Sequence, residues 1–484
     1  MIVYGVLGFL RPAIYILLFP FYLNHFSTGE YGLYNLMLDV GAFAMIIVSF
    51  RISSAMLTYY YNYSHDRKLV KEYLSSTFSA SILLGIVMVV VLYFLGPILF
   101  PIIFKSELVA FFPYGITVII YAAMTEVGTV YITYLKNEKE IVKYSVLILI
   151  QTLAVVFFQI FLIKYYGMGV YGALLGMVIG WSIVLAAIFL FERGIFTLKI
   201  NWSMVTSSLK FSFTLIPYIA IFWLLLQGGR VFLERNTTLE DDSALVIVGI
   251  FSAMMVISKL IILGIESVVN GIRPFLFEQF ALGKHGDLLQ IGLLTKMIII
   301  IPLITVPVVI LVGTNMSLFT SDVEYKSIAP YMTFACLVVF FFIYVKLFYQ
   351  QLIFAKRSDL ATLLSFVALV FLIGGFTYWI PQYEIWGVLY ATLLANVVLA
   401  TLFYIAAQKV TFVRYDLKTI IIYPVMVFGL IFIIEWLMLD YGYSYSAFGI
   451  VQCIVVSILI LFLNRNNFKD YKVLFMNRNK YKSA

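Results

Sequence analysis

The feature that most constrains this 484-residue chain is a succession of apolar runs, each about 20 residues long, separated by short polar breaks. A helical run of this length crosses the hydrocarbon core of a bilayer and satisfies its own backbone hydrogen bonds. Only 12% of the residues are charged, whereas a soluble domain typically has about 25%. The pattern therefore predicts an all-α polytopic membrane protein with no room for a separate soluble domain.

The runs predict fourteen transmembrane helices. Their approximate limits are 2–23, 31–60, 74–103, 110–135, 143–163, 170–191, 208–233, 243–277, 291–313, 327–354, 360–380, 385–407, 419–439 and 446–463. The first run lacks the basic segment and cleavage site of a signal peptide, so we expect a retained helix, although a start further upstream stays open. The two cysteines and three histidines have no metal-ligand spacing, and we expect neither a metal site nor a cofactor.

The distribution of lysine and arginine supports this count of helices. With a cytoplasmic amino terminus, the inner loops and the tail together hold 22 basic residues, and the outer loops hold four. This asymmetry is what the positive-inside rule requires, and it predicts that both termini are cytoplasmic. The pI of about 9.1 then follows from topology, and we expect the basic loops to contact anionic lipid rather than nucleic acid.

Charged residues also occur inside the predicted spans. Six are basic (Arg11, Arg51, Arg230, Lys259, Arg273 and Lys346) and four are acidic (Asp39, Glu126, Glu266 and Glu435). Each charge at a helix centre costs about 2.5–3.5 kcal/mol on translocon-insertion scales, so we expect them to face a protein interior or a water-filled cavity. Three alternatives stay open: a local ion pair between Arg230 and Glu234, snorkelling of Arg273, and structural pairing of Lys346 and Glu435.

One predicted helix carries a regular polar stripe. Ser252, Lys259, Glu266 and Arg273 are spaced by seven residues, nearly two helical turns, so they share one face. Asn270 falls on the same stripe. The rest of this span is apolar, a pattern typical of a helix that lines a cavity. The alternative is interhelical pairing, in which Glu266 contacts Lys259 or the arginine of the second span.

A weak internal similarity indicates two halves. The segment Y-G-L-Y-N-L-M-L opens the second span, V-G-I-F-S-A-M-M opens the eighth, and Gly32 matches Gly249 at an offset of 217 residues. Parallel repeats of this kind are common in transporters, where the substrate site lies between the halves. We therefore predict a six-helix lobe over 1–200, a second over 201–410, and two extra helices with a basic cytoplasmic tail over 411–484.

Several segments resemble one family of transporters. The pattern G-F-L-R-P-A-I-Y-I-L-L-F-P-F-Y-L…S-T-G-E-Y-G-L-Y-N-L and the later F-S-F-T-L-I-P…Q-G-G-R-V-F-L…V-G-I-F-S-A are similar to Wzx-type polysaccharide-repeat flippases. These proteins belong to the multidrug/oligosaccharidyl-lipid/polysaccharide exporter (MOP) superfamily. The family commonly places basic residues in its first, second, seventh and eighth helices, where this chain has Arg11, Arg51, Arg230, Lys259 and Arg273. The outer end of the first helix departs from the family pattern, with Asn24-His25 in place of a basic residue.

The resemblance implies a V-shaped, two-lobed flippase of the bacterial cytoplasmic membrane rather than an enzyme. Its cargo would be an undecaprenyl-diphosphate-linked oligosaccharide for surface polysaccharide such as O-antigen or capsule. Its partners would be membrane lipids and the polymerase and chain-length machinery. The expected anion-binding residues are Arg11, Arg51, Arg230, Lys259, Asn270 and Arg273. Two roles stay open for Asp39, Glu126 and Glu266: binding a coupling proton or sodium ion, and balancing a nearby arginine.

Three other functions remain as alternatives. A lipid II flippase is barely distinguishable from a Wzx-type flippase by sequence. A multidrug exporter of the same superfamily would bind organic cations and should have a cavity dominated by acids, which this sequence does not predict. A membrane glycosyltransferase or polymerase usually carries a sizeable outer loop, whereas most predicted outer breaks here have about ten residues or fewer.

Overall fold

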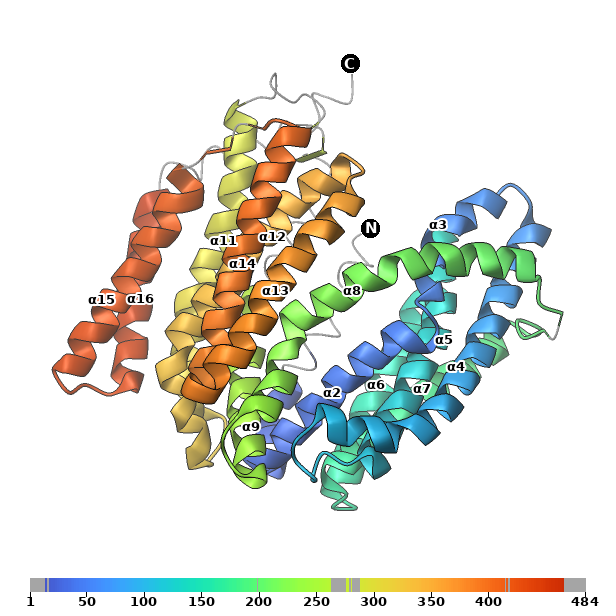
Figure 1. Cartoon of the computed structure of the whole chain (residues 1–484), viewed down its shortest axis with the longest axis horizontal. Helices are drawn as coiled ribbons and strands as arrows, with labels where there is room; N and C mark the ends of the chain where they lie inside the picture. The colour runs from blue at the N-terminus through green and yellow to red at the C-terminus, as the bar shows by residue number, and fades with distance from the viewer. Residues whose placement is uncertain are drawn as a thin grey trace. The chain divides into compact units, whose positions relative to one another are not determined.

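The computed structural model describes residue 14 and residues 17–197, 199–262, 276–277, 280, 288–413, 415–416 and 418–464. Every regular element in these ranges is a helix (Figure 1). Within the described residues, thirteen helices are long and apolar enough to cross a membrane, and they match the second to the fourteenth predicted spans. The first predicted span lies largely outside the described residues, apart from a helical segment at 17–25. The all-α polytopic architecture is confirmed.

The chain divides into two compact units, Met1–Ser252 and Ala253–Ala484. The helices that begin in the first unit are α2 (Thr28–Val48), α3 (Ile52–Tyr63), α4 (Arg67–Ile103), η1 (Phe111–Gly115), α5 (Ile116–Asn137), α6 (Ile141–Lys164), α7 (Gly169–Phe191), α8 (Trp202–Asn236) and α9 (Asp241–Ser258). The helices of the second unit are α11 (Leu288–Thr314), η3 (Met316–Leu318), η4 (Val323–Tyr331), α12 (Met332–Phe354), α13 (Ser358–Tyr383), α14 (Ile385–Val410), η5 (Lys418–Ile422), α15 (Tyr423–Asp440) and α16 (Tyr445–Asn464).

The boundary between the compact units differs from the predicted lobe boundary at 200/201. Helix α8 follows that position, yet it packs against α2, α3 and α4 and so belongs to the first unit. It is 35 residues long, contains Pro217, and bends along its length (Figure 1). Proline lacks the backbone N–H that a helix interior uses, which favours a bend. The division into two six-helix lobes by internal symmetry stays a prediction.

Within the first unit, α5 is the central helix. It contacts α2, α3, α4, α6 and α7, and its membrane-spanning window is 72% buried. The apolar stretch of α4 is only 11% buried, and its exposed side chains include Ile86, Val90 and Phe94. Because lipid tails are as apolar as these side chains, their exposure identifies a surface that faces the bilayer. Helix α5 instead lies in the interior of the unit, where its polar residues Thr125 and Glu126 are buried.

The two glycines singled out by the internal similarity lie against each other. A Cβ atom added at Gly32 would lie 2.3 Å from the carbonyl oxygen of Leu245 and 2.8 Å from the amide nitrogen of Gly249. One added at Gly249 would lie 1.9 Å from the carbonyl oxygen of Thr28. Small residues at such a crossing let two helix backbones approach closely. The paired glycines thus hold the amino-terminal parts of α2 and α9 in backbone contact.

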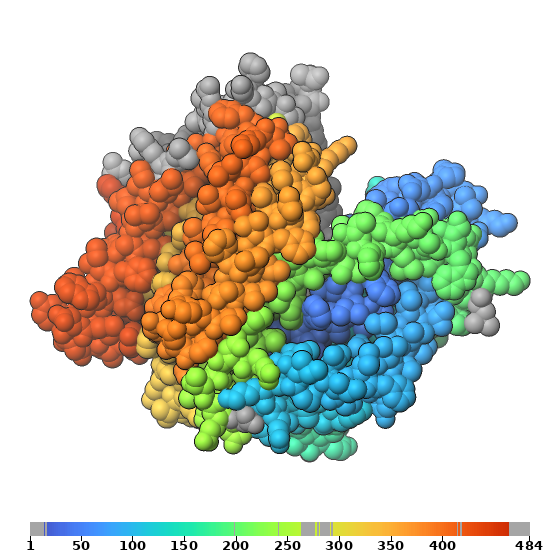
Figure 2. Space-filling view, in the orientation of Figure 1, coloured from blue at the N-terminus to red at the C-terminus, as the bar shows by residue number. Residues whose placement is uncertain are grey.

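In the second unit, α12 packs against α11, α13, α14 and α15. Its carboxyl-terminal half anchors the segment that joins α14 to α15. The Gln351 amide donates to the carbonyl oxygens of Ala407 and Thr411, and the Tyr415 hydroxyl donates to the Gln351 amide oxygen over 2.7 Å. Helix α13, light orange in Figure 2, lies at the surface of this unit. Its exposed side chains include the apolar Leu363 and Val370.

Candidate functional site

The second predicted span is interrupted rather than continuous. Helix α2 ends at Val48, and α3 begins at Ile52. Between them, Phe50 and Arg51 adopt left-handed backbone conformations with φ of 49° and 55°. A residue other than glycine pays roughly 1–2 kcal/mol for this conformation, because its Cβ crowds the following carbonyl oxygen. The predicted single helix over 31–60 is therefore wrong at this point, and a predicted site residue occupies the break.

The carboxylate of Glu126 on α5 binds side chains from both sides of the break. Its Oε1 atom accepts a hydrogen bond from Arg51 Nη1 over 2.8 Å. Its Oε2 atom accepts bonds from Ser53 Oγ over 2.9 Å and Ser49 Oγ over 3.2 Å. Glu126 itself is 1% exposed. A buried carboxylate is tolerable when it is paired with a cation and its other oxygen is hydrogen-bonded, and both conditions hold here.

Arg51 is held but not enclosed. Its side chain is 30% exposed, against 2% for Glu126, and among the described residues only its Nη1 atom donates a hydrogen bond. Its Nε atom has no partner within the same ranges. Its backbone carbonyl accepts a bond from Ser212 Oγ on α8 over 3.0 Å. The planar guanidinium group thus retains donors that are not used by the carboxylate.

A second arginine–carboxylate pair joins α2 to α8. Arg230 Nη1 donates to both oxygens of Asp39, over 2.9 Å to Oδ1 and 2.8 Å to Oδ2. The arginine side chain is 5% exposed and that of the aspartate 1%. Glu234 is the alternative partner considered for Arg230. Its carboxylate accepts hydrogen bonds from the backbone amides of Lys105 and Ser106. Arg230 is therefore enclosed in the interior of the first unit.

The remaining predicted site residues are placed less fully. Lys259 is half-buried in the second unit, one residue beyond the end of α9. The polar stripe was predicted on one helix over 243–277, but α9 ends at Ser258, with Ser252 buried on it. Arg11, Glu266, Asn270 and Arg273 lie outside the described residues. Of the nine predicted residues, the structure brings together Arg51 with Glu126 and Arg230 with Asp39.

Three serines at the break were missed by sequence reasoning. Helical spacing of three and seven residues from Arg51 predicts Ser54 and Thr58 as its polar companions, but Ser54 is half-buried and Thr58 is exposed. The side chains that bind the Glu126 carboxylate are Ser49 and Ser53, two residues before and two after the arginine. Their symmetrical spacing about a charged residue in an apolar span was the available signal. Ser212 is 161 residues distant, and no local pattern indicates it.

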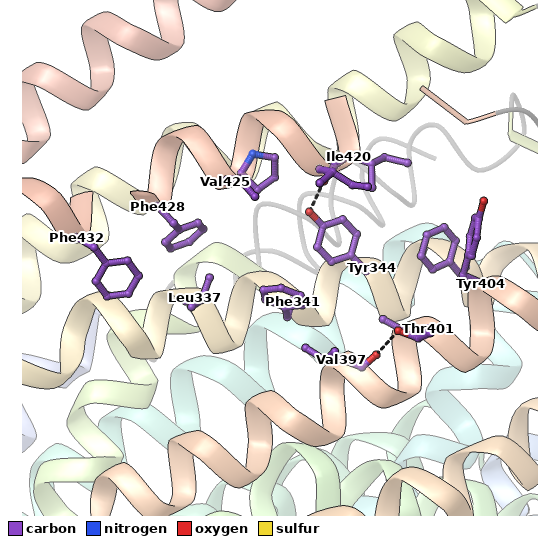
Figure 3. Close-up of a pocket in the computed structure, with 14 residues that line it drawn as sticks. Leu337, Phe341, Tyr344, Val397, Thr401, Tyr404, Ile420, Val425, Phe428 and Phe432 are labelled. Carbon is purple, nitrogen blue, oxygen red and sulfur yellow. Dashed lines mark hydrogen bonds between the residues drawn. The ribbon is translucent and has the colours of Figure 1, made fainter. Parts of the chain in front are cut away.

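A separate feature of the second unit is an apolar groove of about 420 Å³ between α12, α14 and α15 (Figure 3). Its lining residues are Leu337, Phe341, Tyr344, Phe348, Val397, Ala400, Thr401, Tyr404, Ile420, Ile421, Pro424, Val425, Phe428 and Phe432. The Tyr344 hydroxyl donates to the carbonyl oxygen of Ile420, and this bond links α12 to η5 beside the groove. None of these residues is charged, so the groove suits a hydrocarbon chain better than a sugar.

Comparison with solved structures defines the class of fold: this multi-span helical chain has the fold of MOP-superfamily transporters and flippases. It is similar to lipid II flippase MurJ in an inward closed conformation, with a TM-score of 0.72 and 13% identity over 97% of this chain and 100% of that chain. It is also similar to an inward-facing multidrug resistance MATE family transporter of the MOP superfamily, with a TM-score of 0.59 and 13% identity over 84% and 97% of the two chains.

A third similar structure is a MOP superfamily transporter from Pyrococcus furiosus, with a TM-score of 0.55 and 14% identity over 84% of this chain and 93% of that chain. No protein-family model and no curated protein sequence matches the chain. At these identities the likeness establishes the fold. The named neighbours are transporters and flippases rather than enzymes.

Proposed function

We propose that this protein is a flippase that moves an undecaprenyl-diphosphate-linked oligosaccharide from the inner to the outer leaflet of the bacterial cytoplasmic membrane. The observation that carries the proposal is Arg51, a partly exposed guanidinium group held at a break between two helices of a predominantly apolar bundle. The fold supports it, because the similar MurJ structure is named as a lipid II flippase. Movement would follow alternating access between the two halves of the chain.

The chemistry of the cargo matches the residues. A diphosphate and its glycan cannot cross hydrocarbon unaided, and guanidinium groups bind phosphate oxygens through paired hydrogen bonds. Arg51 is the described residue best suited to this role, and we propose that Lys259, Arg11, Arg273 and Asn270 extend the same anion-binding surface. Arg230 is better suited to joining helices, since it is 5% exposed and paired with Asp39.

The apolar groove supports a lipid-linked cargo over a water-soluble one. Its volume of about 420 Å³ falls within the usual range for ligand clefts of roughly 300–1,000 Å³. Its lining of aromatic and aliphatic side chains would accept a hydrocarbon chain through van der Waals packing in place of lipid tails, whereas a polar glycan would lose its hydrogen bonds there. We propose that part of the polyprenyl chain occupies this groove.

The test replaces Arg51 by Ala in cells whose surface glycan depends on this protein. We expect surface glycan to fall by about tenfold or more, the effect of losing about 1.4 kcal/mol of binding, while its lipid-linked precursor accumulates. Arg67→Ala, an exposed position at the start of α4, is the matched control and should leave both quantities unchanged. Normal surface glycan at normal expression of Arg51→Ala would contradict the proposed site.

The same experiment separates the proposed cargo from its alternatives. Mass spectrometry of the accumulated lipid identifies either an oligosaccharide repeat unit or lipid II. Accumulation of lipid II alone would mean that the protein is a lipid II flippase instead. If neither lipid accumulates and the cells become sensitive to organic cations instead, the protein is a multidrug exporter.

A further inference from the structure

The five residues Ser49 to Ser53 form a strained segment that one carboxylate organises. Phe50 and Arg51 both have positive φ, and neither is glycine. Left-handed conformations at such residues persist only where the surroundings over-determine them. Here the surroundings are Glu126, which receives three hydrogen bonds from Ser49, Arg51 and Ser53, and a serine of α8 that donates to the Arg51 carbonyl.

We propose that Glu126 is a positioning residue for Arg51 rather than a coupling-ion site or a contact for the cargo. The inference rests on the proposed function, in which Arg51 binds the diphosphate. Glu126 holds one guanidinium nitrogen, Nη1, and fixes the backbone on both sides of it through the two serines. The rest of the guanidinium group is then presented in one orientation, which lowers the entropy cost of binding an oxyanion.

The geometry argues against a direct role for Glu126. Its side chain is 2% exposed, and both of its oxygens accept hydrogen bonds from the break. The three donors occupy most of the roughly four acceptor positions of the carboxylate, and its burial limits the access of a coupling ion to the remaining one. Arg51 differs, because 30% of its side chain is exposed and only one of its nitrogen atoms, Nη1, binds the carboxylate. The carboxylate therefore acts through the arginine.

A positioning role and simple charge balance predict opposite effects of one substitution on the affinity for the diphosphate. Glu126→Gln keeps the size of the side chain but removes its charge. If Glu126 only offset the charge of Arg51, the variant would attract a diphosphate more strongly than the natural chain does. If Glu126 positions Arg51, the variant binds the diphosphate less tightly, because the guanidinium group and the strained backbone lose their charged acceptor.

The experiment measures the affinity of the purified full-length chain in detergent for undecaprenyl diphosphate, with undecaprenyl alcohol as the uncharged control. We expect Arg51→Gln to weaken binding of the diphosphate by about tenfold and Glu126→Gln by about threefold to tenfold. Added to Arg51→Gln, the second substitution should change the affinity by less than about twofold, because a residue that acts through another has no effect once the other is gone. Affinity for the alcohol should not change.

The matched control is Glu140→Gln, an exposed glutamate before α6, which should bind as the natural chain does. Should Glu126→Gln fail to fold, the double variant Ser49→Ala and Ser53→Ala keeps the ion pair and removes the two hydroxyl donors. We expect that variant to bind the diphosphate about threefold more weakly, with unchanged affinity for the alcohol.

Each result has one meaning. Equal or tighter binding by Glu126→Gln, or losses that multiply in the combined variant, would overturn the positioning role while leaving Arg51 as a ligand. Natural affinity in the serine double variant would overturn it as well. Natural affinity in Arg51→Gln would remove the anion site itself, and with it the residue on which the proposed function depends.

Discussion

The first unit contains two arginine–carboxylate pairs, each formed by charges from apolar spans, and the two pairs differ in exposure and in the backbone around them. Arg51 pairs with Glu126, and Arg230 pairs with Asp39, at N–O distances of 2.8 Å in both cases. Arg51 is 30% exposed and stands at a strained helix break, whereas Arg230 is 5% exposed and lies within a regular helix. A charge in an apolar span is thus not sufficient to identify a site.

Exposure separates the two arginines, whereas pairing does not. Pairing removes most of the cost of a buried charge in both places, so it is common to structural links and functional sites. Access distinguishes the two arginines: both bind their carboxylate through Nη1 and leave a buried Nε atom without a partner among the described residues, but only Arg51 is exposed enough for a ligand to reach. Backbone strain adds to the distinction, since it is retained where it serves the orientation of a side chain.

The largest expected effect on stability belongs to the enclosed pair. Arg230→Gln removes the cation that binds both oxygens of the buried Asp39 carboxylate, and removing one partner of a buried pair costs about 3–5 kcal/mol. We expect a clear drop in the melting temperature of the purified protein in detergent. Replacing both partners by apolar residues, as Asp39→Leu with Arg230→Met, should recover most of the loss. A melting temperature within a degree or two of the natural chain for Arg230→Gln alone would contradict the structural role.

For the exposed pair, Arg51 and Glu126, we expect a substitution to affect binding more than stability. Arg51→Gln leaves Glu126 with two serine hydrogen bonds beside a partly exposed position, so we expect a smaller loss of stability, about 1–2 kcal/mol. Its main effect should be on binding of the diphosphate, where the loss is about tenfold. Thermal melting and binding measured on the same preparations test the comparison. A larger loss of stability in Arg51→Gln than in Arg230→Gln would reverse our assignment.

Membrane physics explains why much of the fold could be predicted from the sequence. A bilayer requires a helix wherever about 20 apolar residues occur, and the predicted span 170–191 differs by one residue from α7, Gly169–Phe191. The charged residues of the candidate site could be predicted for the same reason, because charges are rare and costly in such spans. The matched glycines Gly32 and Gly249 were also detectable, and they prove to be in contact.

The pairing and the helix break could not be predicted in this way. Glu126 is 75 residues from Arg51, and Asp39 is 191 residues from Arg230, so only the packing of α2, α5 and α8 brings them together. The segment around the break reads M-I-I-V-S-F-R-I-S-S-A, which has no glycine or proline to indicate an interruption. Tertiary hydrogen bonds impose the left-handed residues there, against the local preference of the chain.

A smaller effect tests whether α8 supports the break. Ser212 is fully buried and donates to the Arg51 carbonyl over 3.0 Å. Ser212→Ala removes this bond, and we expect a loss of about 1 kcal/mol in stability with a modest weakening of diphosphate binding. The control is Ser207→Ala, a half-buried serine of the same helix whose hydroxyl donates locally to the Ser203 carbonyl. Identical behaviour of the two variants would show that α8 does not stabilise the break.

The smallest expected effect concerns the backbone strain itself. Phe50→Gly removes a ring that lies 6.4 Å from the Phe213 ring, but it also relieves a left-handed conformation that costs roughly 1–2 kcal/mol at a residue other than glycine. We expect these contributions nearly to cancel, within about 1 kcal/mol. Phe43→Gly is the matched control, because Phe43 lies in the regular part of α2 with its ring 4.8 Å from that of Trp223.

Phe43→Gly should lower stability by about 1 kcal/mol through the poor helix propensity of glycine. The lost aromatic contact should lower it by about a further 0.5–1.5 kcal/mol. Thermal melting of both variants measures the difference between them. A loss at Phe50 equal to or greater than that at Phe43 would mean that the left-handed backbone carries no strain. The segment would then need no outside carboxylate to hold it, and the contrast between the two arginines would depend on exposure alone.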